Sequence, residues 1–102
     1  MNKTFASLGI NVSLVEALTN QHITEPTAVQ EQAVPAALKG HNLLVQAQTG
    51  TGKTLAFLLP IFQGIKKDAS MTQALIMAPT RELSEQLATV ADSFTPVTGL
   101  DI

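Results

Sequence analysis

The sequence predicts an α/β fold in which helices flank a parallel sheet. Two short apolar segments, residues 42–46 and 73–78, have the length and composition of buried strands, and a helical pattern follows each of them. A glycine-containing loop, Ala47–Thr54, joins the first predicted strand to its helix. Strand, helix, strand and helix in this order imply parallel strands joined by right-handed crossovers.

Two helices are predicted before the first strand. After an irregular lead-in over residues 1–12, a short helix covers Ser13–Asn20, with the serine as its N-cap. A second helix begins at a capping box over residues 27–30 and stops at Gly40. Pro35 lies inside this second pattern, where we expect it to kink or divide the helix.

Two further helices follow the predicted strands. The first covers Leu55–Phe62, and we expect Phe57, Phe62 and the leucines between them to lie in the core. The second covers Thr80–Ser93 as an amphipathic helix. Residues 97–102 then have the pattern of a loop entering a third strand. Two or three strands are too few for an ordinary doubly wound sheet, so the sequence predicts the front part of a domain.

Composition narrows the class of protein. The 102 residues leave room for at most one ordinary domain, and 45% hydrophobic residues favour a globular chain. A net charge of −2 provides no basic excess that would by itself indicate nucleic-acid binding. The absence of cysteine excludes disulfides and thiolate zinc sites, and His22 and His41 are isolated. With no secretory leader or membrane-spanning run, we expect a soluble, cytoplasmic protein with no membrane partner.

The loop Ala47–Thr54 has the residues that a nucleotide phosphate site requires. Its glycines allow backbone N–H groups to approach phosphate oxygens, Lys53 can reach the β- and γ-phosphates, and the Thr54 hydroxyl can bind Mg²⁺. The predicted phosphate-binding residues are Gln48, Thr49, Gly50, Thr51, Gly52, Lys53 and Thr54. The alternative is a glycine- and threonine-rich turn that precedes a lysine by chance. The position between a strand and a helix favours a nucleoside triphosphate site with Mg²⁺.

Three segments together resemble the DEAD-box family of ATP-dependent RNA helicases. Residues 22–30, with Phe5 seventeen residues upstream, are similar to the Q motif that recognises adenine in this family. The phosphate loop has the family's form, including its opening alanine, and Pro79–Gln86 looks like motif Ia. The resemblance implies an incomplete first RecA-like domain over residues 41–102, preceded by a Q-motif region over residues 1–40. Ile23 stands where the family usually has an aromatic residue.

Gln30 and Phe5 each have two possible roles. The Gln30 carboxamide presents a donor beside an acceptor, which matches the N6 and N7 atoms of adenine, but it also occupies the position that completes the capping box with Thr27. Phe5 can stack on the base or pack in the core, and the resemblance favours the base.

Motif Ia implies an RNA contact through Pro79, Thr80 and Arg81. The start of a helix favours an anion, because its N–H groups are unpaired and the dipole is positive there. The alternative is a capped helix with a solvated arginine that pairs with Glu85 one turn later.

The sequence contains no acidic pair after an apolar strand, and no arginine finger is apparent. In the family these groups belong to later motifs and to a second RecA-like domain. The resemblance therefore implies the N-terminal part of a helicase that binds ATP and RNA, with later helicase domains as partners. The alternatives are a nucleotide-binding or interaction module without turnover, and a small-molecule kinase that uses the same loop. The sequence predicts no oligomeric state.

Overall fold

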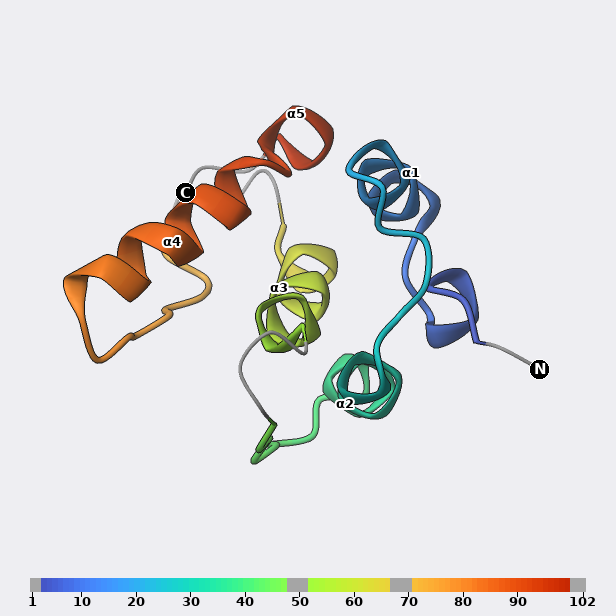
Figure 1. The fold of residues 1–102 in the computed structure, drawn as a ribbon, viewed down its shortest axis with the longest axis horizontal. Helices are drawn as coiled ribbons and strands as arrows, with labels where there is room; N and C mark the ends of the chain where they lie inside the picture. The colour runs from blue at the N-terminus through green and yellow to red at the C-terminus, as the bar shows by residue number, and fades with distance from the viewer. Residues whose placement is uncertain (1–2, 48–51, 67–70, 100–102) are drawn as a thin grey trace.

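The computed structural model describes residues 3–47, 52–66 and 71–99. Its elements are a 3₁₀ turn η1 (Ala6–Leu8) and the helices α1 (Val12–Asn20), α2 (Ala28–Leu38), α3 (Lys53–Gly64), α4 (Arg81–Asp92) and α5 (Thr95–Thr98). Helix α3 lies centrally, with α2 on one side and the α1 and α5 helices near its far end (Figure 1). The predicted helices are therefore present, and their ends differ from the predicted ones by at most two residues.

The N-terminal helices form where local capping favours them. Asn11, and not the predicted Ser13, caps α1, because its extended backbone lets the side chain accept the N–H of Leu14 at 3.0 Å. The predicted capping box of α2 is confirmed, and α2 continues through Pro35 to Leu38 as one helix. Gly40, at φ 86°, follows the end of this helix.

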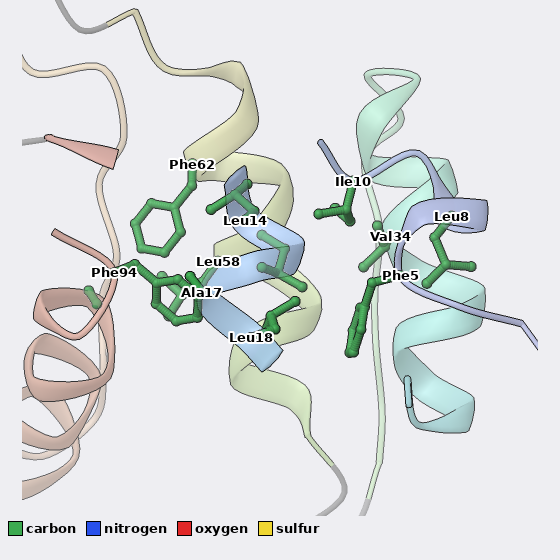
Figure 2. Close-up of a cluster of buried hydrophobic side chains, with 12 residues drawn as sticks. Phe5, Leu8, Ile10, Leu14, Ala17, Leu18, Val34, Leu58, Phe62 and Phe94 are labelled. Carbon is green, nitrogen blue, oxygen red and sulfur yellow. The ribbon is translucent and has the colours of Figure 1, made fainter. Parts of the chain in front are cut away.

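One apolar core joins the helices (Figure 2). Leu14, Ala17 and Leu18 recur at helical spacing on α1 and bury one face of that helix. The rings of Phe62 on α3 and Phe94, just after α4, lie with their centroids 5.3 Å apart in a tilted arrangement. The core includes residues on both sides of the predicted boundary at residue 40. The fully buried large side chains are Leu14, Leu18, Gln30, Val34, Leu58, Leu59 and Phe94.

The predicted strands do not form in the described residues. Residues 42–46 and 73–78 have no strand pairing, and their apolar side chains face solvent, with Leu44 fully exposed and Leu75 80% exposed. A strand is stable only where a neighbouring strand receives its backbone hydrogen bonds. Within the described part of the chain, neither segment pairs with the other, so both remain without strand structure.

Two smaller expectations were also wrong. Phe57 is 37% exposed, unlike Phe62, Leu58 and Leu59, because it lies on the face of α3 that the unpaired segment 43–45 leaves open. Residues 95–98 form the short helix α5, which ends at Gly99 in the left-handed conformation, where a loop toward a third strand was expected from residue 97. Residues 100–102 lie outside the described part.

Candidate nucleotide and RNA site

Gln30 connects the Q-motif segment to the phosphate loop. Its Nε2 donates to the carbonyl oxygen of Gly52 at 3.2 Å, and its Oε1 accepts the N–H of Thr27 at 2.9 Å. The side chain is only 2% exposed, so these two bonds satisfy a carboxamide that would otherwise be buried without partners. The capping role of Gln30 is confirmed, and no local sequence pattern marks its bond to Gly52, 22 residues away.

Gly52 has a geometry that only glycine fits well. Its φ of +86° lies in the left-handed region, and a Cβ at this position would lie 2.6 Å from the Nε2 of Gln30 and 3.1 Å from the Cγ2 of Thr27. A side chain here would therefore meet both backbone strain and the Q-motif side chains. The sequence predicted a glycine for close approach to phosphate, and the structure adds a close approach to Gln30.

Lys53 and Thr54 form the first turn of α3, where a phosphate group would meet unpaired N–H groups. Lys53 is exposed and Thr54 is partly buried. Gly52 provides no side-chain cap to α3, whereas Asn11, Thr27 and Thr80 cap the other described helices of nine or more residues. The first N–H groups of α3 thus have no side-chain acceptor in the described residues. The predicted loop residues Gln48, Thr49, Gly50 and Thr51 lie outside the described part.

Phe5 lies in the core. Its side chain is 2% exposed and belongs to the same apolar cluster as Leu8, Ile10 and Val34. In this conformation the ring is used for packing and offers no open face to a base. Stacking of Phe5 on adenine stays a prediction that requires this packing to open.

The motif Ia residues begin α4 at the surface. Thr80 caps the helix by accepting the N–H of Leu83 at 3.1 Å, and the exposed Arg81 pairs with Glu85 at 3.5 Å. These are the contacts of the capped-helix alternative, and such an exposed ion pair contributes only about 0.2–0.5 kcal/mol. Pro79 is exposed just before them. All three residues are accessible to a ligand, and their contact with RNA stays a prediction.

A largely apolar groove of about 540 Å³ lies between α2, α3 and the unpaired segment that precedes the phosphate loop. Lys53 is its charged residue. The groove is lined by Ala33, Ala37, His41, Leu43, Val45, Lys53, Ala56, Phe57, Pro60 and Ile61. It marks the face of α2 and α3 that the described part of the chain leaves uncovered.

Protein side chains alone form no metal site within the described ranges. In residues 3–47, 52–66 and 71–99, no three His, Cys, Asp or Glu side chains come together as a ligand set. A hydroxyl such as that of Thr54 can still bind Mg²⁺ when nucleotide phosphates supply the other oxygens. Among the described helices, none has the length and apolar character needed to cross a bilayer.

Comparison with known proteins identifies the family. The model of the DEAD/DEAH box helicase family matches residues 27–102, which include the capping box, the phosphate loop and motif Ia. The chain belongs to this family. It is 48% identical over 108 residues to the ATP-dependent RNA helicase DBP9 of Coccidioides immitis, covering 100% of this chain and 18% of that protein. The chain thus spans about a fifth of the length of the curated relatives it matches.

Solved DEAD-box structures show the same arrangement of elements. The RNA helicase Prp28 from Chaetomium thermophilum, bound to ADP, matches with a TM-score of 0.89 and 35% identity over 98% of this chain and 26% of that one. The Dbp5 protein of S. cerevisiae, bound to RNA and ADP BeF3, matches with a TM-score of 0.83 and 32% identity over 93% of this chain and 25% of that one. The described helices therefore have the fold of part of a DEAD-box RecA-like domain.

Proposed function

We propose that this DEAD-box chain is the N-terminal, ATP-binding part of an RNA helicase that separates RNA duplexes or remodels RNA–protein complexes. The observation that carries the proposal is the hydrogen bond from Gln30 to Gly52, which brings the Q motif and the phosphate loop together at the start of α3. A module without turnover is not favoured, because the matched relatives are named ATP-dependent RNA helicases.

The residues at the start of α3 fit a nucleotide with Mg²⁺. The uncapped N–H groups and the exposed Lys53 provide donors and positive charge for the β- and γ-phosphates, and the Thr54 hydroxyl provides an oxygen ligand for the cation. Bound Mg²⁺ would neutralise charge on the phosphates. The backbone of residues 48–51 is proposed to surround them.

Gln30 can cap α2 and read adenine at once. Its carboxamide oxygen has a second lone pair beyond the bond from Thr27, and its nitrogen has a second hydrogen beyond the bond to Gly52. These remaining groups match the N6 amino group and N7 of adenine. Because the side chain is buried, base binding at this position requires a small opening of its surroundings.

RNA is the proposed second ligand, at the exposed start of α4. Thr80 and Arg81 would contact the phosphate backbone, which requires Arg81 to leave its weak pair with Glu85. The structural neighbour Dbp5 was solved with RNA, which supports RNA as the ligand class.

The parallel sheet is proposed to form in the whole protein. Residues 42–46 and 73–78 are mostly apolar and mostly exposed, and strands from the rest of the RecA-like domain would supply their backbone partners and cover the groove. Later motifs and the second domain would supply the acidic groups and the arginine finger for hydrolysis. We propose a cytoplasmic location for this protein.

An ATP titration of the natural protein that carries these residues tests the proposal. Wild type should bind ATP in the presence of Mg²⁺, and Lys53→Ala should abolish measurable binding by removing the charge that faces the phosphates. Lys66→Ala is the matched control, since Lys66 is also an exposed lysine on this part of the chain but follows α3. Unchanged ATP affinity in Lys53→Ala would remove the site assignment.

A further inference from the structure

Gln63, near the C-terminal end of α3, holds the segment that precedes α1. Its Nε2 donates to the carbonyl oxygen of Gly9 at 2.7 Å, and its Oε1 accepts the N–H of Asn11 at 2.8 Å. One side-chain amide thus satisfies a carbonyl and an N–H on either side of Ile10. Since these partners are 52 and 54 residues away in sequence, the two bonds fix the path of the N-terminal backbone over α3.

The segment held in this way, residues 5–10, is here called the N-terminal strap. Its apolar side chains Phe5, Leu8 and Ile10 are 2%, 5% and 4% exposed. Figure 2 shows them gathered beside Val34 of α2, and all four belong to one buried cluster. The strap therefore packs on α2 through apolar contacts while Gln63 ties it to α3.

Val34 connects the strap to the proposed base site. It lies four residues after Gln30, so both side chains project from the same face of α2, and their exposures are 0% and 2%. Gln30 in turn bonds to Gly52 at the start of α3. A series of contacts thus runs from the two surface hydrogen bonds of Gln63, through the buried side chains of the strap and Val34, to Gln30 one turn earlier on α2. Along α3 itself, Gln63 is roughly 16 Å from Gly52, at about 1.5 Å per residue, which is too far for direct contact with a base there.

We propose that Gln63 is a positioning residue for adenine recognition. It anchors the strap, the strap keeps α2 seated against α3, and the Gln30 carboxamide is thereby held where it can discriminate adenine from guanine. This inference rests on the proposed function of ATP binding. It assigns to Gln63 an effect on base selectivity, whereas the phosphate contacts at Lys53 and Thr54 do not depend on it.

The experiment compares two glutamine variants in the natural protein that carries these residues. Gln63→Met keeps a side chain of similar volume and removes both hydrogen bonds. Gln73→Met is the matched control, because Gln73 makes the same pair of bonds, but locally, to the N–H and carbonyl of Lys66 at 2.9 and 2.8 Å. Dissociation constants are measured for Mg²⁺ complexes of ATP, GTP and inorganic tripolyphosphate, which has no base.

The expected result separates base recognition from phosphate binding. Gln63→Met should weaken ATP binding by roughly 3- to 10-fold, as expected for one or two lost hydrogen bonds, and reduce the preference for ATP over GTP. Tripolyphosphate binding should stay within about twofold of wild type, since no phosphate ligand has moved. Gln73→Met should match wild type for all three ligands. Gln63→Glu keeps an acceptor for Asn11 but sets a carboxylate oxygen against the carbonyl oxygen of Gly9, so it should reduce the preference at least as much as Gln63→Met.

Several results would overturn the inference. An unchanged ATP-to-GTP preference in Gln63→Met would show that the anchor does not act on base recognition. Equal losses of ATP and tripolyphosphate binding would show a general destabilisation. A wild-type protein that binds ATP and GTP equally would refute the role of Gln63 while leaving ATP binding intact. Failure of the wild type to bind ATP at all would instead refute the proposed function itself.

Discussion

The close approach of Gly52 to Gln30 predicts an unusually large cost for Gly52→Ala. An alanine at φ +86° costs about 1–2 kcal/mol in backbone strain. Its methyl group would also lie 2.6 Å from the Gln30 Nε2, and that side chain cannot swing away freely because it is buried and bonded to Thr27. Such overpacking typically costs about 1–3 kcal/mol. The lower entropy of an unfolded alanine returns about 0.4–1 kcal/mol.

The expected net loss for Gly52→Ala is therefore about 1–5 kcal/mol of unfolding free energy, the sum of these contributions. Substitutions at two other glycines separate the cost of backbone strain from the cost of the clash with Gln30. Gly40 has the same φ of +86° but no atom within 4 Å of its added Cβ, so Gly40→Ala should cost only about 1 kcal/mol from strain. Gly64, at the end of α3, has open space and an ordinary φ, so Gly64→Ala should be neutral or slightly stabilising.

Thermal unfolding followed by circular dichroism measures these differences. For a chain of this size, about 1 kcal/mol shifts the midpoint by 4–8 °C, so Gly52→Ala should unfold at least about 4 °C below Gly40→Ala. In the double variant with Gln30→Ala, the loss should be smaller than the sum of the single losses by about 1 kcal/mol or more, because the clash is removed. Equal losses at Gly40 and Gly52, or strict additivity with Gln30→Ala, would refute the reasoning from this contact.

Three further predictions follow from the site. Gln30→Ala should weaken ATP binding and reduce the difference between the affinities for ATP and GTP, as measured in competition assays. An unchanged difference in affinity, together with lower helix stability, would leave only the capping role. Arg81→Ala should weaken RNA binding for all sequences and leave ATP affinity unchanged. It should also reduce the slope of log K for RNA binding against log salt concentration by about one; a wild-type slope would make Arg81 a solvated surface residue. The 102-residue chain alone should show no RNA-stimulated phosphate release and should self-associate on size exclusion. A monodisperse monomer whose turnover is lost in Lys53→Ala would contradict that last expectation.

The features that the sequence predicted well are those determined by neighbouring residues. The capping box of α2 depends on Thr27 and Gln30 alone, and the N-cap of α4 depends on Thr80 and the backbone three residues later. The cap of α1 was misplaced by two residues, because Asn11 and Ser13 are both good capping residues and only the backbone conformation decides between them.

The motifs of the site could be predicted from the sequence, but the hydrogen bonds between them could not. The phosphate loop and the Q-motif glutamine have recognisable residue patterns. The bonds from Gln30 to Gly52 and from Gln63 to Gly9 join segments 22 and 54 residues apart, and nothing in the local sequence marks those pairs. The burial of Phe5 could not be predicted for the same reason, since it depends on where the strap lies against α2.

The two predicted strands show that a segment with the composition of a strand does not form one without a partner strand. Helices satisfy their backbone groups within one segment, so α2 and α3 form from their own residues. Residues 42–46 and 73–78 have the composition of strands, but a ladder requires a second backbone at hydrogen-bond distance. Leu44, Leu75 and Met77 are exposed by 100%, 80% and 83%, and the groove lined in part by Leu43 and Val45 leaves one face of α3 uncovered. Apolar side chains on an extended backbone are stable in water only when another surface covers them, so these segments are where we expect added strands to associate first.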